Sequence, residues 1–579
     1  MSDAQALILV AWLVVGLAFI GLGVLVRRAL GLELTGGAEG WLGSFWLGFS
    51  GAIALLQLWQ LAWPVDDRAL AGFLVLGGAG LVLEGKRLSL ALLRGFRRGW
   101  PALLALALAA WWISNHALGG PRNGDSGLYH VPMVCWFDQH RLVPGLVNLD
   151  FAFGYSQSYF LYAALLDKGP FLHGAHHLAN SLLLLALLAR VLWGALALAR
   201  PGAGGLEAQD LYYALWLPVA LHLTLDINLT SPAPDFAVFV LGVVLAGELV
   251  GLVARSRSGS ASAEPLALAL LACAATTLKL TVAADAAATL GVGIAWWLRR
   301  ARPTARRARR PAMVIAAVLL LVLVPWMARA VILSGYPLYP AHFAPFPVDW
   351  RAPTARFMSI WPRSAVQDAT HRTWLAMFAR SWGWNQVGVV LPLALAGNAA
   401  LLVLPLRHLG SLARPPLPRT SGVILLPTAL ALIFWFVSSP MARFAGAAFW
   451  VLAALMVLLA LEGQMHRWRL ARVVLLGVLL ATAAGMLARS RHLLRHLSDF
   501  EPMAAPIVRP VTLPSRLKIW YAERYQQCWD APLPCTPWIN PALRLRRPGD
   551  LESGFTVEPP ARSASGGGAN PAVSSSPAR

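Results

Sequence analysis

The sequence predicts an all-α polytopic membrane protein with about fourteen transmembrane helices and long extracytoplasmic loops. Of its 579 residues, 58% are hydrophobic and 13% are charged, and the mean hydropathy is +0.60. A soluble globular domain has about 45–50% apolar and about 25% charged residues. The apolar residues form long Leu/Ala/Val runs, which suit helices of roughly 20 residues and not the alternating strands of a barrel.

Hydropathy places each of the spans, with boundaries good to a few residues. The expected spans are residues 6–26, 42–62, 69–84, 100–117, 178–198, 211–226, 235–253, 265–279, 281–298, 311–332, 384–405, 421–438, 444–461 and 472–488. The runs 265–279 and 281–298 meet with almost no turn. One broken or re-entrant segment is therefore the alternative for this pair.

The formal net charge of +21 indicates how the spans are oriented. In a soluble protein this charge would indicate nucleic acid as a partner. Here the Lys and Arg residues lie in short loops between apolar runs, most densely at 299–310. An RNA-binding arm or an anionic-lipid contact is the alternative, but one positive-inside alternation accounts for every basic loop. We therefore expect a lipid bilayer and no nucleic acid as partner, with the basic loops inside.

This topology leaves three long segments on the outer face. We expect N-terminal spans over 1–99 and a membrane core over 100–488, with outer loops at about 115–177 and 334–383. An extracytoplasmic segment would follow over 489–556, and a disordered Gly/Ser/Pro/Ala-rich tail over 557–579. Because the inner loops are short and plain, the chemistry is expected outside.

The first outer loop carries the densest group of reactive side chains. Residues 124–130 are Gly-Asp-Ser-Gly-Leu-Tyr-His, so two glycines flank Asp125 and allow a sharp turn at the membrane surface. A carboxylate there could act as general base on a hydroxyl or hold a cation against a phosphate. The alternative is a turn aspartate that bonds its own backbone. Tyr129 and His130 are the neighbours expected to assist the site.

Aromatic residues fill the rest of this loop. Residues 131–140 predict a short amphipathic helix in the interface, anchored by Trp136 and Phe137. Residues 151–159 mix aromatic and small polar groups, which is typical of sugar-binding surfaces and also of interfacial belts.

The acidic outer loop, the interfacial helix and the many spans together resemble the GT-C superfamily of membrane glycosyltransferases. More narrowly, four motifs resemble those of a group of bacterial multi-spanning proteins. These motifs lie at 124–130 with 143–146, at 334–340, at 348–350 and at 528–535. The superfamily loop normally follows the first span and often has two adjacent acids. Here it follows about the fourth span, and Ser126 stands beside Asp125.

The resemblance implies an enzyme of the bacterial inner (plasma) membrane. Such enzymes transfer a sugar from a polyprenyl-phosphate donor, usually with inversion, to a saccharide, lipid or protein acceptor. Asp125 matches the position of the loop carboxylate, which acts as base or metal partner. The resemblance also implies a second acidic outer position, for which Asp235 is the candidate. Helix capping is the alternative role of Asp235.

Several basic groups lie at span ends, where ionisable residues are costly. Lys279 suits a phosphate of the donor lipid, although it could also extend to the surface as an anchor. Arg329 and Arg443 would lie at the outer face, and arginine suits bidentate phosphate recognition. Arg122, two residues before the first motif, and Tyr336, in the motif at 334–340, complete the expected substrate-binding residues.

Histidine and cysteine residues bear on metal and redox chemistry. His173 and His177 share a helical face, but no acid stands where a zinc-protease helix needs one. A polar cluster is therefore expected, the metal stays unknown, and a divalent ion is the one cofactor left open. Cys528 and Cys535 are expected to form a disulfide if the tail lies in an oxidising compartment.

These observations favour a glycosyltransferase, with two alternatives. One is a transporter or flippase of a lipid-linked saccharide, which would use the same basic groups. The other is a polymerase or ligase of surface polysaccharide. A transporter predicts charged groups deep in several spans, and the sequence has few of them.

Overall fold

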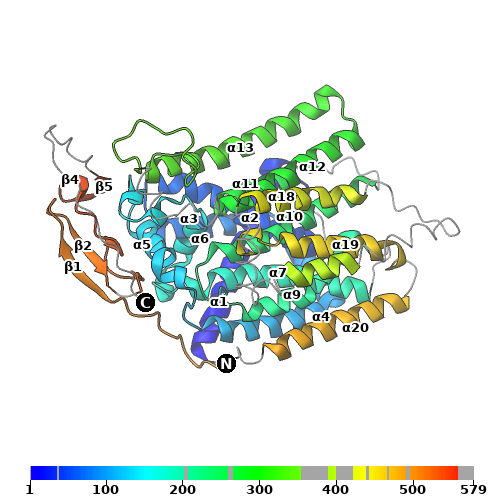
Figure 1. Ribbon diagram of the computed structural model, residues 1–579. Coiled ribbons are helices and arrows are strands. Elements are labelled where there is room, and N and C mark those ends of the chain that lie inside the picture. The colour runs from blue at the N-terminus through cyan, green and yellow to red at the C-terminus, as the bar shows by residue number, and fades with distance from the viewer. Residues whose placement is uncertain are drawn as a thin grey trace.

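The computed structural model shows a bundle of helices with a small β-structure at one end (Figure 1). It describes residues 2–34, 38–200, 206–257, 265–353, 389–398, 421–438, 442–465, 469–490, 494, 496–523 and 525–557. The expected span 384–405 therefore lies mostly outside the described residues, as do the tail 557–579 and much of the loop 334–383.

Helices make up most of the described chain. The first four are α1 (Asp3–Leu30), α2 (Ala38–Gln60), α3 (Asp67–Leu83) and α4 (Gly85–Ala117). The first outer segment contains the π-helical turn η1 (Ser126–His130), α5 (Val131–Gln139), η2 (Leu146–Asn148), η3 (Phe151–Gly154), α6 (Tyr159–Leu166), η4 (Gly169–Phe171) and η5 (Ala175–His177). The middle of the chain forms α7 (Ala179–Ala199), α8 (Ala208–Leu215), α9 (Leu217–His222), η6 (Leu223–Leu225), α10 (Pro234–Arg257), α11 (Leu266–Leu278), η7 (Leu280–Val282), α12 (Ala283–Ala301) and α13 (Ala305–Ser334). The last helical elements are η10 (Ser421–Leu425), α18 (Leu426–Ser438), η11 (Ala442–Ala445), α19 (Ala448–Met465) and α20 (Arg469–Arg489).

The count of about fourteen spans is wrong for the described chain. Seven described helices are long and apolar enough to cross a membrane, and three further apolar helices are shorter. The seven are Asp3–Leu30, Gly40–Gln60, Ala175–Ala199, Pro234–Arg255, Leu280–Ala301, Ala305–Ser334 and Arg469–Arg489. The shorter ones are Leu266–Leu278, Gly422–Ser438 and Ala448–Leu461. The expected span 211–226 is broken into α8, α9 and η6, with Pro218 at the start of α9.

The pair 265–279 and 281–298 forms two helices, α11 and α12, joined through the turn η7. These helices contact each other, and the break lies at Lys279, whose backbone is extended at φ −159°.

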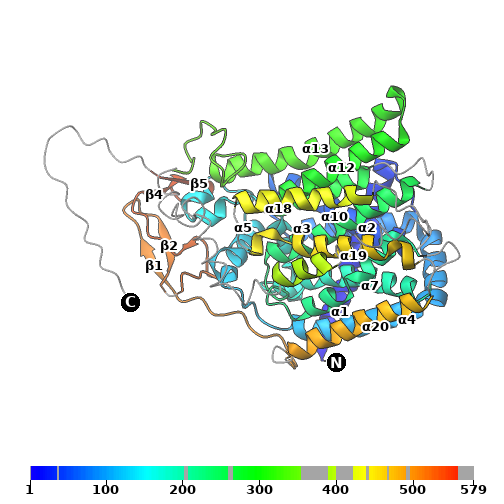
Figure 2. The ribbon, with the colours of Figure 1, turned by 45° about the vertical axis from the view of Figure 1, so that its right-hand side comes forward.

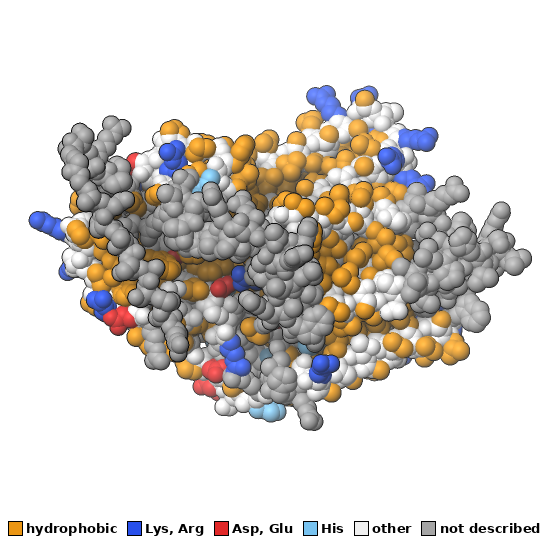
Figure 3. Space-filling model, viewed as in Figure 1, with side chains coloured by type: hydrophobic (Ala, Val, Ile, Leu, Met, Phe, Trp, Pro, Cys, Tyr) orange, Lys and Arg blue, Asp and Glu red, His pale blue; other side chains and the backbone are white. Residues whose placement is uncertain are grey.

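The flank of the bundle is apolar where the candidate spans are exposed (Figure 3). Leu320, Leu321 and Val473 are each at least 59% exposed, and only 11% of the apolar window of α20 is buried. Because water does not favour so large an apolar surface, a lipid bilayer is the environment that fits it.

The two ends of the bundle differ in character. The strands and α5 lie at one end in both ribbon views, and the α12–α13 turn lies at the other (Figures 1 and 2). Residues 299–310 contain this turn and the adjoining ends of α12 and α13, and arginine side chains gather there (Figure 3). The β-structure also carries basic residues, among them Arg509, Arg544 and Arg546, so it is the dense basic run at 299–310 that agrees with the positive-inside pattern.

The segment expected over 489–556 is a β-module, so the protein is not entirely helical. In one sheet, β1 (Val508–Thr512) pairs antiparallel with β2 (Lys518–Ala522), and β2 pairs parallel with β3 (Cys535–Thr536). In the other, β4 (Leu543–Arg547) pairs antiparallel with β5 (Asp550–Val557). A disulfide joins Cys528 to Cys535, the pair predicted from the sequence.

Helix α5 forms where the amphipathic helix was expected, but it is not an interfacial helix. Trp136 and Phe137 are each only 1% exposed, so they are core residues and not membrane anchors. Trp136 packs edge-on against Phe555 of β5, with 5.9 Å between the ring centroids. The β-module covers the face that was expected to meet lipid.

Glycines allow α1 and α3 to pack at backbone contact. A Cβ placed on Gly77 would lie 2.6 Å from the Cα and the carbonyl oxygen of Ala18, and one placed on Gly21 would lie 1.8 Å from the carbonyl oxygen of Gly77. Small residues are typical of helix contacts in membranes, where packing and not hydrophobicity drives association.

We predict that Gly77→Val destabilises the protein and that Gly72→Val, on the same helix, does not. The valine at 77 would have to separate the two helices, at a cost of roughly 1–3 kcal/mol or more. Gly72 is exposed and has no atom within 4 Å of the added Cβ. The measurement is thermal unfolding of each variant in nanodiscs. Equal midpoints for the two variants would contradict the close α1–α3 contact.

Candidate functional site

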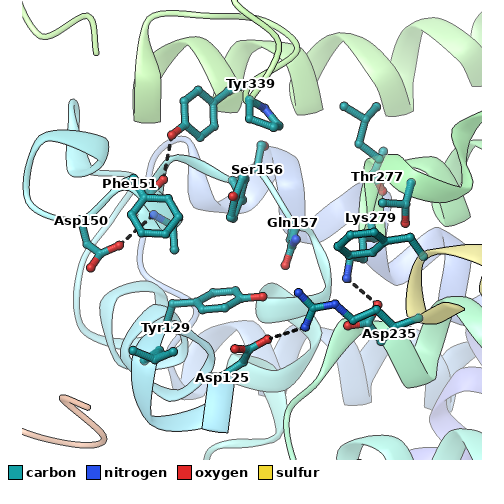
Figure 4. Close-up of a pocket in the computed structure, with 18 of the residues that line it drawn as sticks. Asp125, Tyr129, Asp150, Phe151, Ser156, Gln157, Asp235, Thr277, Lys279 and Tyr339 are labelled. Carbon is teal, nitrogen blue, oxygen red and sulfur yellow. Dashed lines mark hydrogen bonds and ion pairs between the residues drawn. The ribbon is translucent and has the colours of Figure 1, made fainter. Parts of the chain in front are cut away.

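A cavity of about 610 Å³ lies at the end of the helix bundle where the β-module sits (Figure 4). Its charged lining side chains are Asp125, Asp150, Asp235, Lys279 and Arg443. Its aromatic lining side chains are Tyr129, Phe151, Tyr155, Trp326, Tyr339, Phe444 and Trp538. These residues come from widely separated parts of the chain, including the β-module.

Asp125 stands immediately before the π-helical turn η1. Its backbone N–H donates to Oδ1 of Asn123 at 3.0 Å, and the Asn123 amide in turn donates to Asn228 Oδ1 at 2.7 Å. Its carboxylate makes no capping bond to the turn. Instead Oδ2 lies 3.5 Å from Nη1 of Arg443, and the side chain is 31% exposed. The carboxylate therefore faces the cavity, unlike that of a turn aspartate.

A second ion pair lies on the neighbouring wall. Lys279 Nζ donates to Oδ1 of Asp235, in the first turn of α10. The side chains of Lys279 and Asp235 are 10% and 22% exposed. The helix break after α11 places the lysine here, and a position at the start of α10 favours a negative charge. Asp235 therefore stabilises the first turn of α10 and also lines the cavity.

One aromatic ring connects the two pairs. Lys279 Nζ lies 5.4 Å and Arg443 Cζ lies 4.8 Å from the ring centroid of Phe444. Arg443 and Phe444 belong to η11, which contacts η7 beside Lys279. The ring attracts both cations, so it stabilises two positive charges close together.

Tyr129 and His130 differ in their access to the cavity. Burial and the nearby charge of Asp125 raise the pKa of Tyr129, so its hydroxyl stays protonated. His130 does not line the cavity and is 1% exposed. Burial, with the charge of Lys279, holds the His130 pKa well below its usual value. His130 therefore packs against Tyr129, whose ring centroid is 4.4 Å away, and the structure places it behind the cavity wall and not among the groups that face a ligand.

Three of the expected substrate-binding residues, Arg122, Tyr336 and Arg329, do not line the cavity. Arg122 is exposed. Tyr336 is buried, and its hydroxyl donates to the carbonyl of Ala352 at 3.4 Å. Its neighbour in the same motif, Tyr339, lines the cavity instead and donates to the carbonyl of Phe151 at 3.0 Å.

Arg329 is fully buried behind the cavity wall. Its Nε donates to Gln60 Oε1 at 3.0 Å, and its Nη1 contacts the hydroxyls of Ser158 at 3.3 Å and Ser156 at 3.5 Å. Ser156 lines the cavity, whereas the guanidinium does not. Arg329 can therefore act on a ligand only through its charge and through the serine hydroxyls.

Sequence reasoning missed Asp150, Gln157 and the β-module residues Gln526 and Trp538, all of which line the cavity. The carboxylate of Asp150 accepts from the backbone N–H of Ala152 at 2.8 Å and so caps η3. Gln157 belongs to the polar and aromatic stretch 151–159, which the sequence marked out. No local signal marked Gln526 or Trp538.

The β-module contacts the loop that carries Asp125. The backbone N–H groups of Cys528 and Trp529 both donate to the carbonyl of Gly127, at 2.8 and 3.0 Å. The side-chain amide of Gln527 donates to the carbonyl of Gly124 at 3.1 Å. Two motifs that are 400 residues apart are therefore in direct contact.

The other motifs meet on the far side of the same module. The N–H of Phe555 donates to the carbonyl of Pro144 at 2.9 Å, and the N–H of Gly145 donates to the carbonyl of Ile332 at 2.8 Å. The amide of Asn148 donates to the carbonyl of Trp350 at 2.8 Å. The motifs at 143–146 and 348–350 therefore contact the β-module, while the motif at 334–340 reaches the cavity through Tyr339.

The described residues do not bring three or more His, Cys, Asp or Glu side chains together in a way suited to a metal ion. In the histidine cluster, Nδ1 of His177 lies 2.6 Å from the carbonyl of Ala117, and the rings of His176 and His177 are 3.9 Å apart. Asp125 and Asp235 are each paired with a cation, which a metal ion would have to displace.

Comparison with curated proteins finds no match, and neither does comparison with solved structures. A protein family described as "Domain of unknown function (DUF8201)" matches residues 6–450, which is well over half of the chain. Most of the cavity lining lies within the match, whereas the β-module follows it in the chain. The chain therefore belongs to this DUF8201 family.

Proposed function

We propose that this protein is a membrane glycosyltransferase that moves a sugar from a polyprenyl-phosphate donor to an acceptor hydroxyl. The observation that carries the proposal is the composition of one cavity. An accessible carboxylate, Asp125, lies beside two cations, and aromatic side chains form the rest of the wall. A base, a phosphate site and a surface for a sugar ring are what such a reaction needs.

Lys279 and Arg443 supply the phosphate site. Both carry a positive charge toward the cavity, and Arg443 is 53% exposed, so a ligand can reach it. In the empty cavity, Asp235 and Asp125 hold these cations in place. A donor phosphate replaces a carboxylate as partner, since guanidinium and ammonium groups bind phosphate oxygens well.

The charge balance of the site is compatible with an anionic ligand. Three carboxylates line the cavity against two cations. The buried guanidinium of Arg329 lies directly behind Ser156 and supplies a third positive charge. A divalent ion that arrives with the donor phosphate would add further positive charge, with Asp125 and Asp235 as the accessible carboxylates.

Asp125 acts as the general base. When phosphate occupies Arg443, the carboxylate is free to accept the proton of an acceptor hydroxyl. The hydroxyl oxygen then forms a bond to the anomeric carbon while the bond from that carbon to the donor phosphate breaks. The phosphate leaves with the bonding electron pair, and one displacement inverts the anomeric centre. The protonated hydroxyl of Tyr129 can donate a hydrogen bond to the reacting groups.

The position of the cavity suits a lipid-linked donor. The cavity lies at the end of apolar helices whose flanks fit a bilayer, so a polyprenyl chain can stay in lipid while its headgroup enters the site. The basic α12–α13 turn at the opposite end supports our proposal that the cavity opens on the outer face. We propose the bacterial inner membrane, crossed several times, as the location that the resemblance to membrane glycosyltransferases implies.

The transporter hypothesis uses the same cations but requires a charged path through the bundle. The buried pair of Arg190 and Asp210 is a charged group within the helices, with 2.7 Å between the two partners. This pair is not part of the cavity lining. Asp285 and Arg329 are further ionisable residues within candidate spans, and neither lines the cavity. We favour the enzyme because the accessible carboxylate of Asp125 lies beside two cations in the cavity, and the polymerase or ligase hypothesis is a variant of it with a larger acceptor.

We predict that Asp125→Asn lowers sugar transfer at least about 100-fold, because the amide cannot accept the proton. The assay uses purified protein in lipid with radiolabelled polyprenyl-phosphate sugars. The matched control is Asp349→Asn, which removes an exposed acid that pairs with Arg546 outside the cavity. Equal turnover in wild type and Asp125→Asn would rule out Asp125 as the base. No turnover in the wild type, across a broad donor panel, would favour a transporter.

We predict that Lys279→Gln and Arg443→Gln each weaken donor binding about 10-fold, because each removes a charged hydrogen bond to phosphate. Binding is measured with a fluorescent polyprenyl-phosphate sugar in nanodiscs, at low and high salt. Arg509→Gln, which removes a surface partner of Glu523 in the β-module, is the control. If both cavity variants bind the donor as the control does, these cations do not form the phosphate site.

A further inference from the structure

The loop that carries Asp125 is fastened from the β-module and not only from the helices. The carbonyl of Gly127, two residues after Asp125, accepts from the N–H groups of both Cys528 and Trp529. The Trp529 ring covers the same glycine, because a Cβ on Gly127 would lie 2.4 Å from Trp529 Cε2. The turn therefore has an aromatic cover and two hydrogen bonds from one short segment.

We infer that the disulfide-closed loop 528–535 is a positioning element of the site, and that Trp529 is its positioning residue. Trp529 and the two N–H groups hold the π-helical turn η1, and through it they hold the Asp125 carboxylate against Arg443. The geometric part of this inference stands alone, whereas its effect on sugar transfer rests on the proposed function.

The packing of Trp529 links the turn to the helix that follows it. Trp529 is 6% exposed and packs with Val131 and Cys135 of α5. It therefore contacts both the turn η1 and the first turns of α5. A side chain in that place limits how far the turn can rotate relative to the helix, which a contact with the turn alone would not do.

The chain within and just before this loop has an uncommon backbone conformation. Tyr525, Gln526 and Trp529 have φ values of 57°, 58° and 47°, in the left-handed region that side chains rarely adopt. Such residues persist where the surrounding structure over-determines them, and they cluster at functional sites. Here the disulfide joins Cys528 to Cys535, and Cys535 pairs with Trp520 in the sheet.

The same segment also closes the cavity. Gln526 lies on one side of the disulfide-closed loop, and Pro537 and Trp538 lie on the other, and all three line the cavity. The β-module thus sets the position of the carboxylate and forms part of the wall around the substrate. If the β-module moved away from the helices, the carboxylate would lose its support and the cavity would lose part of its wall. The site is therefore complete only when the module is in place.

Hydrogen exchange of the segment 121–131 tests the positioning role without any substrate. We expect Trp529→Ala to raise the exchange rate of the amides in this segment about 10-fold or more, and Trp529→Phe to restore most of the protection. The control is Trp350→Ala, which removes a tryptophan whose indole N–H donates to the carbonyl of Val331 on the other side of the module. Unchanged exchange in Trp529→Ala would overturn the inference.

Kinetics then separate positioning from general stability. In the transfer assay, Trp529→Ala is expected to lower kcat about 10- to 100-fold with little change in KM for the donor, because a small displacement of a reacting group has an effect of this size. Trp529→Phe should recover most of the rate. A rise in KM alone, or no rescue by phenylalanine, would contradict a positioning role.

Two further variants keep the test independent of one substitution. Cys528→Ser/Cys535→Ser should increase exchange in the segment 121–131 as Trp529→Ala does. Gly127→Ala displaces the tryptophan ring, so Gly127→Ala/Trp529→Ala should be no worse than either single variant. Additive effects would show that the two residues act independently and would contradict the inference. If the wild type transfers no sugar but the exchange results hold, the proposed function fails while the positioning role stands.

Discussion

Charge pairing at the end of the helix bundle is the constraint on which the site depends. Lysine and arginine near a bilayer are costly unless a carboxylate or an aromatic ring compensates them. Asp235 and Asp125 compensate Lys279 and Arg443, and Phe444 lies against both cations. The charges that would bind a substrate are therefore kept in place before it arrives, so the protein does not have to reorganise them on binding.

This pairing requires segments far apart in the chain to end at the same level of the bundle. Asp235 begins α10, Lys279 follows α11, and Arg443 lies in η11 between α18 and α19. Each is placed by the end of a helix, and so its position depends on helix packing. Backbone contacts at glycines such as Gly21 and Gly77 fix α1 against α3 without long side chains between them. Rigid packing of this kind makes the ends of the helices suitable for a site.

The sequence predicted the charged part of the site better than the number of spans. Asp235, Lys279 and Arg443 could be found because an ionisable group at the end of an apolar run is unusual enough to mark a position, and Asp125 because two glycines flank it in a long outer loop. Hydropathy could not separate a spanning helix from a short or broken one, so 211–226 appeared to be a span although the chain breaks it into α8 and α9. Apolar runs of these lengths look alike until their neighbours are known.

The sequence could not predict which side chains face the cavity, and the reason is physical. Arg329 and Tyr336 lie close to cavity residues in the chain, at Trp326 and Tyr339, but burial decides which of each pair faces the cavity. That choice depends on how α13 is rotated and how the following loop folds, which only tertiary packing determines. The π-helical turn that follows Asp125 could not be predicted either, because it packs against Trp529, which lies 400 residues later in the chain.

The β-module is where motifs that are far apart in the sequence come into contact. Gly127 is small because Trp529 lies over it, Gly145 has φ 68° and would place a Cβ 2.2 Å from the carbonyl oxygen of Phe555, and Gly554 would place one 2.3 Å from that of Pro144. In each case the glycine permits close contact between an outer loop and the module. Motifs noted in the sequence therefore lie on the two sides of one interface. Contacts at that interface also bear on the cavity, because the module forms part of its wall.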